Sequence, residues 1–151
     1  MKTVLVPIDF SPVSNPVVKA AVALAKALKG RLVLLHAVQP PIITSEYGAV
    51  MTNIQEIIAI SEKVAARALT RQQRRLEAGG LKVTTVLVTG GAVPHILEQA
   101  AKYSAAYIVM GSHGHSALYE LFAGSTTTGV LKKSPCPVVV VPPARKKTAR
   151  K

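Results

Sequence analysis

The chain has 151 residues, of which 49% are hydrophobic and 17% charged, so it is long enough to bury one core and too apolar to be intrinsically disordered. No apolar run approaches the roughly 20 residues of a membrane span, and the single cysteine excludes an internal disulfide framework. The formal net charge of +12 indicates attraction to something acidic. We therefore expect a cytoplasmic protein without a membrane segment, made of one domain over residues 1–143 and a basic, disordered tail over 144–151.

Strand and helix patterns alternate from the start of the chain. The apolar run over residues 3–8 predicts a first strand, because it is too short for a signal-peptide core. Asn15 and Pro16 are typical of an N-cap and a first helical position, and Gly30 is typical of the end of that helix. The nearly continuous apolar run over residues 31–38 predicts a second strand that is covered on both faces. Residues 42–53 show no pattern, and we expect a mobile loop there.

The rest of the chain continues this alternation. We predict a long helix over residues 54–78, a third strand over 82–88 and a third helix that Pro94 opens. A fourth strand over 106–110, a short helix over 125–133 and a fifth strand over 137–141 follow. The inner face of the long helix is assigned to Ile54, Ile57, Ile58, Val64, Ala65, Ala68, Leu69 and Leu76. The alternation predicts an α/β fold with a parallel, doubly wound sheet, and a ligand beyond the carboxyl ends of its strands.

A glycine-rich segment follows the predicted fourth strand. Glycines stand at positions 111, 114 and 124, and Ser125 and Thr126 open the next helix. Glycines let backbone N–H groups approach a phosphate, and a helix N-terminus adds unpaired donors and a partial positive charge. The segment is neither a Walker A loop nor a Rossmann G-x-G-x-x-G, and it contains no Lys or Arg. The segment can hold a polyphosphate on backbone donors, but the glycine spacing by itself favours a plain surface loop.

Asp9 is the only aspartate in the chain and stands where the first strand ends. A carboxylate there can contact the adenine or ribose of a nucleotide, or help to hold a divalent ion near phosphates. The alternative is a structural role in an Asx turn, with Ser11 contributing similarly. The residue by itself favours neither interpretation.

Taken together, these residues resemble the universal stress protein family over nearly the full chain. The motif G-x2-G-x9-G-[ST] is met at Gly111, Gly114, Gly124 and Ser125, beside the segments VLVPIDFS, IVMGSHG and SPCPVVVVP. In that family the full motif marks the ATP-binding branch. The resemblance implies a Rossmann-like fold of the adenine nucleotide alpha hydrolase type, with a five-stranded parallel sheet in the order 3-2-1-4-5, helices on both faces, and commonly a homodimer.

The resemblance also implies a set of nucleotide contacts and a cofactor, ATP, with Mg²⁺ accompanying it. The contacts come from the ends of three strands and from the start of the helix that follows the glycines. They are Pro7, Ile8 and Asp9 after the first strand, Ala37 after the second, Met110, Gly111 and Gly114 after the fourth, and Gly124, Ser125 and Thr126 at the helix start. Thr126 departs from the family, which often has an apolar β-branched residue at this position.

Four other residues and the fifth strand have simpler interpretations. His113 and His115 have no nearby Cys or acid, so we predict no metal site there. His36 is interpreted as a hydrogen-bonded core residue and Cys136 as a small buried one. The fifth strand, from Pro137 to Val141, is expected at a sheet edge, where pairing with a second chain would cover it and form a homodimer.

The expected function is an ATP-binding regulatory or stress-response module with slow or no turnover, and no residue is assigned a catalytic role. One alternative is a slow ATPase, or a protein that phosphorylates itself on Ser125 or a nearby threonine. The other is a partner-binding or nucleic-acid-binding protein that uses its basic surface. The basic residues concerned are Arg67, Arg71, Arg74, Arg75 and the tail over 145–151.

Overall fold

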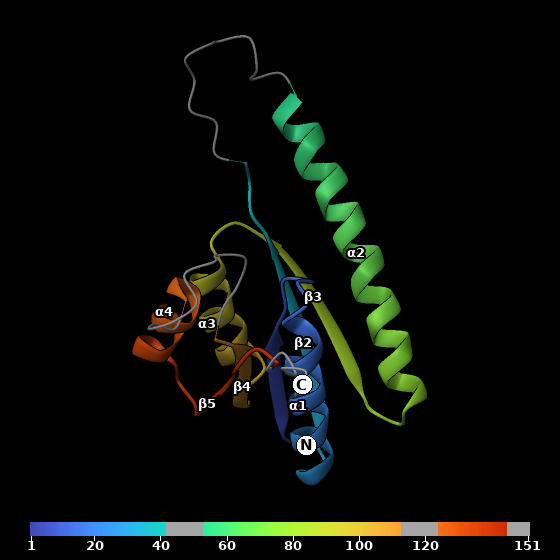
Figure 1. Ribbon diagram of the computed structural model, residues 1–151, viewed down its shortest axis with the longest axis vertical. Coiled ribbons are helices and arrows are strands. Elements are labelled where there is room, and N and C mark those ends of the chain that lie inside the picture. Colours follow the sequence, from blue (N-terminus) through green and yellow to red (C-terminus); the bar gives the residue numbers. More distant parts are fainter. Residues whose placement is uncertain (42–52, 113–123, 145–151) are drawn as a thin grey trace, which may run out of the picture.

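The structure is a computed structural model, and it describes residues 1–41, 53–112 and 124–144. Five strands form one parallel sheet in the order β3-β2-β1-β4-β5, which confirms the predicted topology (Figure 1). The strands are β1 (Thr3–Pro7), β2 (Arg31–Val38), β3 (Val83–Thr89), β4 (Ala105–Gly111) and β5 (Val138–Val141). Register places Pro7 beside Leu35, and Leu35 beside Val86. The carboxyl ends of the strands therefore meet at one edge of the sheet.

Helices cover both faces of the sheet, as predicted. The helices α1 (Ser14–Ala27) and α2 (Ile54–Ala78) pack on one face, and α3 (Ala92–Lys102) and α4 (Ser125–Lys133) on the other (Figure 1). Successive strand residues point to opposite faces, so Val4 and Val6 belong to the core under α1 and α2, whereas Leu5 belongs to the core under α3. Both cores are needed because a parallel sheet is apolar on its two sides.

Two helix starts differ from the predictions. The helix α1 begins at Ser14 with Val13 as N-cap, so Asn15 is not the cap and Pro16 is the third helical residue. Likewise α3 begins at Ala92, before Pro94. The reason is that none of the first four helical N–H groups has an acceptor within the helix, so a proline is tolerated at any of these positions, not only at the first.

The interpretations of His36, Cys136 and the fifth strand have different outcomes. The Nδ1 atom of His36 lies 2.8 Å from the carbonyl oxygen of Ile8, which confirms the hydrogen bond, although the ring is only partly buried. Cys136 is half-buried rather than buried, in a turn where its N–H donates to the Ser134 hydroxyl. The strand β5 is an edge strand, as predicted.

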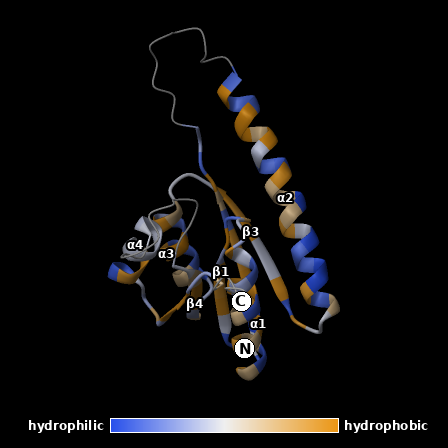
Figure 2. Ribbon diagram, in the orientation of Figure 1, coloured by the Kyte–Doolittle hydropathy of each residue, from blue (hydrophilic) through white to orange (hydrophobic). Residues whose placement is uncertain are grey.

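The long helix α2 packs differently from the prediction. Ala65, Leu69 and Leu76 are buried, but Ile57 and Val64 are 46% and 61% exposed. In Figure 1 the amino-terminal half of α2 rises clear of the strands, and Figure 2 shows apolar residues along it. The assignment of those two residues to the inner face is therefore wrong. They are exposed because the sheet does not extend beneath that half of the helix.

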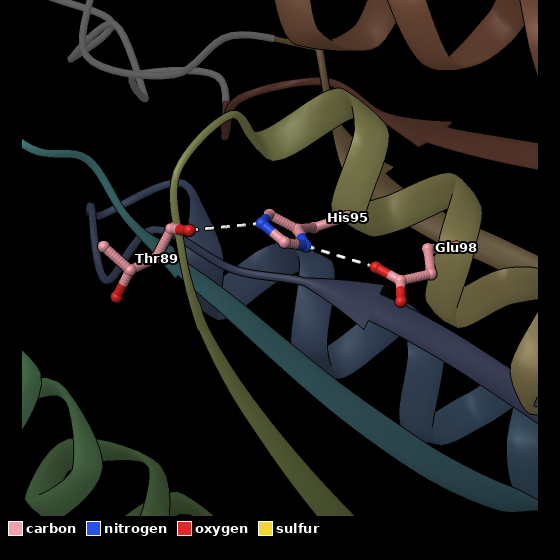
Figure 3. A network of polar contacts seen from close by, with 3 residues as sticks. All are labelled: Thr89, His95 and Glu98. Carbon is pink, nitrogen blue, oxygen red and sulfur yellow. Dashed lines mark hydrogen bonds and ion pairs between the residues drawn. The ribbon is translucent and has the colours of Figure 1, made fainter.

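A polar network holds the turn between β3 and α3. In Figure 3 the His95 ring lies between the carbonyl oxygen of Thr89, 3.2 Å from Nε2, and the carboxylate of Glu98, 3.3 Å from Nδ1. The hydroxyl of Thr89 donates to Glu62 on α2 at 2.6 Å. The network therefore joins α2 and α3 across the end of β3.

Some predictions fall outside the described residues. These are the 42–53 loop, of which only residue 53 is described, the histidines at 113 and 115, and the basic tail beyond residue 144. Among the helices that are described, none combines the length and the apolarity that crossing a membrane would demand.

Candidate functional site

A cavity of about 300 Å³ opens at the carboxyl edge of the sheet. Its floor is made by the ends of β1, β2 and β4, and its walls by residues near the starts of α1, α3 and α4. The lining residues are Pro7, Ile8, Asp9, Val13, Ser14, Val17, Leu35, Ala37, Ile96, Met110, Gly111, Gly124, Ser125, Thr126 and Thr127. This is the place where open α/β sheets hold ligands, and the volume lies at the lower end of the range for small-molecule sites.

The floor of the cavity is largely apolar. Leu35 and Met110 are buried core residues, and Ala37 stands one pleat further along β2 than Leu35, on the same face of the sheet. Because Ala37 has a short side chain, it leaves room above the strand ends. Such a floor suits a flat, apolar ligand group better than a charged one.

Asp9 leaves β1 in a turn that its own carboxylate stabilises. Its Oδ1 atom accepts hydrogen bonds from the Ser11 N–H at 2.9 Å and from the Ser14 hydroxyl at 3.0 Å. The Asx-turn interpretation is therefore confirmed, and the same residue also lines the cavity. The turn positions the carboxylate at the cavity wall, so the structural role and a ligand-binding role are compatible.

The two ends of the glycine-rich segment are tied together beside the cavity. The Thr127 hydroxyl donates to the carbonyl of Gly111 at 2.8 Å, and the Gly124 N–H donates to the carbonyl of Ser112 at 2.7 Å. These bonds place the N-terminus of α4 against the end of β4. The first turn of α4 contains no acidic residue, and no side chain caps its N-terminus. The N–H groups of a first helical turn have no acceptor within their own helix, and together with the helix dipole they favour an anion there.

The structure gathers the predicted contact residues around this one cavity. Every predicted residue that lies in the described ranges lines it: Pro7, Ile8, Asp9, Ala37, Met110, Gly111, Gly124, Ser125 and Thr126. Gly114 lies outside the described residues. Their role in ligand binding stays a prediction.

Sequence reasoning missed the contributions of α1 and α3. Val13, Ser14 and Val17 line one wall, and Ile96 another. Ser14 could have been found from its position five residues after Asp9, at the start of a helix. Ile96 could not, because its spacing marks it only as an apolar helical residue.

The charged side chains that line the cavity determine whether it can hold a metal ion and support catalysis. Among the described lining residues, Asp9 is the only carboxylate and there is no Lys or Arg. In the described part of the chain, no three His, Cys, Asp or Glu side chains lie together so that they could hold a metal ion. A Mg²⁺ ion fits this donor set only if ligand phosphates and water supply most of its oxygen ligands, as is usual for Mg²⁺.

Comparisons with known proteins agree on one family. A family model described as the universal stress protein family matches residues 1–142. Universal stress protein YxiE of Bacillus subtilis is 32% identical over 91% of this chain and 96% of its own length. The solved structure of MJ0577 from Methanocaldococcus jannaschii, 30% identical, covers 96% of this chain and 98% of its own, with a TM-score of 0.81. A universal stress protein solved in complex with cAMP is 26% identical over 93% and 96%, with a TM-score of 0.66.

Proposed function

The chain belongs to the universal stress protein family, and on that premise we propose that it binds an adenine nucleotide, ATP foremost, in the cavity at the strand ends. One observation carries the proposal: the hydrogen bonds from Thr127 and Gly124 bring an uncapped helix N-terminus to the same cavity as an apolar floor. A nucleotide has the matching parts, since its base is flat and its phosphates are anionic. The relative solved with cAMP supports the same ligand class.

The proposed pose follows from the chemistry of the lining. The base lies on the strand ends near Pro7, Ala37 and Met110, where apolar surface excludes water. The ribose lies beside Asp9, whose carboxylate accepts hydrogen bonds from sugar hydroxyls. The phosphates lie against the backbone of Gly111 and against Gly124, Ser125 and Thr126 at the start of α4, with Gly114 assigned to them from the motif. When Mg²⁺ is bound, it neutralises phosphate charge.

We propose a regulatory module with slow or no turnover rather than a fast enzyme. Fast phosphoryl transfer needs a positioned base and cationic stabilisation at the transferred group, and the described lining offers one carboxylate and no cationic side chain. The carboxylate oxygen Oδ1 of Asp9 is already engaged by Ser11 and Ser14. Slow hydrolysis, or phosphorylation of the exposed Ser125, remains the second candidate function because Ser125 stands where the phosphates are proposed to lie.

We further propose that the protein is a homodimer that pairs through β5. The strand lies at the sheet edge, and Val139 is 38% exposed there. Pairing of two such edges would satisfy their unpaired backbone groups and cover the valines. The division into a domain over 1–143 and a tail, a role in the stress response and the cytoplasmic location stay predictions.

The deciding experiment measures the nucleotide carried by freshly purified protein, released by denaturation and identified by ion-exchange chromatography. The site variant is Ala37→Leu, which fills the cavity floor, and its matched control is Ala27→Leu on the exposed side of α1. We expect near-stoichiometric ATP in the wild type and the control, and none in the site variant. ADP alone would favour the slow ATPase. Protein that is empty and takes up no added ATP with Mg²⁺ would contradict the proposal.

A further inference from the structure

One flank of α2 is apolar and open to solvent. Ile57, Ile60 and Val64 are 46%, 63% and 61% exposed, and they are three of the seven large hydrophobic residues exposed on the described part of the chain. They follow each other by three and then four residues, so they line one side of the helix. A contiguous exposed apolar stripe of this kind marks an interaction surface more often than isolated residues do.

This flank is not an extension of the core. The buried residues of α2 are Ala65, Leu69 and Leu76, and helical geometry puts the three exposed residues roughly 80–140° around the axis from Ala65. The core face is anchored independently, because Glu62 accepts from Thr89 and the Gln73 side chain donates to the carbonyl of Val83 at 3.0 Å. Figure 3 shows that Thr89 is itself tied into the turn at His95. The exposed flank is therefore presented on a helix that is already held in place.

The same flank continues into a row of arginines. Arg67, Arg71 and Arg74 follow Val64 with spacings of three, four and three residues, and all are exposed. The six residues thus keep the alternating three-four spacing of a coiled-coil seam, the first half apolar and the second half cationic. We call this row the α2 seam: Ile57, Ile60, Val64, Arg67, Arg71 and Arg74.

The carboxylates of α2 do not neutralise the seam. Glu62 is bonded to Thr89 on the side of β3, and Glu77 accepts from Gln73 at 3.2 Å. Glu56 borders only the apolar half, next to Ile60 in the helix. Glu77 follows Arg74 by three residues and so borders the last arginine, whereas Arg67 and Arg71 have no acidic residue three or four positions away on this helix.

We propose that the α2 seam docks an acidic amphipathic helix of another protein. The partner helix places apolar side chains against Ile57, Ile60 and Val64, and Asp or Glu side chains against the arginines. The three-four spacing allows a second helix to pack along the seam. The cationic half requires acidic residues in that partner helix and fixes its orientation along α2. Because α2 is already ordered, docking costs little ordering of this chain. The seam lies apart from the strand-end cavity, so this inference is independent of the nucleotide site.

Other occupants match the seam less well. Two copies of this chain packed in parallel would set arginine against arginine, and packed antiparallel they would bury arginines against isoleucines. A membrane-surface helix carries its apolar residues along its whole length, whereas here apolar and cationic residues succeed each other along the axis. A nucleic acid would leave the apolar half without a partner.

The test uses a fluorescently labelled synthetic helix with leucines at its seam positions in one half and glutamates in the other, titrated with the full-length protein. We expect saturable binding that weakens with salt and is lost when the glutamates are replaced by glutamine. The triple variant Arg67→Glu, Arg71→Glu, Arg74→Glu and the variant Ile60→Gln should each weaken binding about tenfold or more, which is about 1.4 kcal/mol or more. The matched control changes the same net charge elsewhere: Lys19→Glu, Lys82→Glu, Lys132→Glu, all at exposed positions outside α2.

Three outcomes would overturn the proposal. The first is binding that is equal in the seam variants and the wild type, or equally weakened by the lysine control. The second is seam-dependent binding to phosphatidylserine vesicles without binding to the peptide, which would assign the flank to a membrane. The third is self-association in sedimentation that Ile60→Gln abolishes, which would make a second copy the occupant. Circular dichroism melts of all variants check that they are folded.

Discussion

The hydroxyl of Thr127 and the carbonyl oxygen of Gly111 lie 2.8 Å apart, and this hydrogen bond fastens the first turn of α4 to the last residue of β4. Sixteen residues separate the two in the chain, and the whole glycine-rich segment lies between them. The bond thus decides where the helix N-terminus stands relative to the strand ends.

Thr127→Val keeps the shape of the side chain and removes the hydrogen bond. Thr127 is 2% exposed, so the Gly111 carbonyl loses a buried partner, and we expect unfolding free energy to fall by about 1–3 kcal/mol. Nucleotide affinity should fall as well, because α4 is no longer held. Urea unfolding and calorimetric titration with ATP measure the two effects. Thr70→Val is the matched control, because the Thr70 hydroxyl donates to the Ala66 carbonyl at an exposed site. This substitution should change neither the unfolding free energy nor the nucleotide affinity by much. Equal effects of the two substitutions would contradict the role of the Thr127 hydrogen bond in holding α4.

Asp9→Asn distinguishes the structural role of Asp9 in the turn from its proposed role in ligand binding. Asparagine retains an oxygen that accepts from the Ser11 N–H and the Ser14 hydroxyl, so thermal stability should stay close to that of the wild type. The lost charge should weaken binding of ATP with Mg²⁺ about tenfold, a change of about 1.4 kcal/mol. Asp9→Ala should lower both stability and affinity. If Asp9→Asn binds ATP as tightly as the wild type, Asp9 acts only in the turn.

Gly30→Ala should destabilise the fold. A Cβ atom at position 30 would collide with the backbone carbonyl of Lys2, and that carbonyl also accepts from the Arg31 N–H at 2.8 Å. Because backbone atoms must move, we expect a loss of about 1–3 kcal/mol in chemical denaturation. Gly79→Ala is the control: its Cβ would meet only the Leu76 carbonyl oxygen at 3.3 Å, and its effect should be much smaller. If the Gly30→Ala protein is as stable as this control, the backbone of Gly30 does not lie as close to the Lys2 carbonyl as described.

Val139→Lys tests the proposed pairing of β5 edges. The side chain is 38% exposed, so the variant should fold, but two lysines facing each other across a paired edge repel. We expect the wild type to sediment as a dimer and the variant as a monomer. Leu131→Lys on α4, where Leu131 is 49% exposed, should leave the dimer intact. A variant that remains dimeric would place the interface elsewhere.

The sequence by itself determined the order and type of the elements and the chemistry available at the strand ends. Short apolar runs indicate strands and helical spacing indicates helices, and the nearly continuous apolar run of β2 indicates burial on both faces. Parallel strands then bring Asp9, Ala37 and Gly111 to one edge, because all their carboxyl ends point the same way. The order of the strands came from the family resemblance, since periodicity does not specify which strands are neighbours.

Only the tertiary structure decided which surfaces those elements share. The wall formed by Ser14, Val17 and Ile96 depends on where α1 and α3 begin relative to the sheet. The exposure of Ile57 and Val64 depends on how far the sheet reaches under α2. Helical spacing shows which residues lie on one side of a helix, but burial is a property of what lies opposite. That is set by long-range packing, which no local pattern contains.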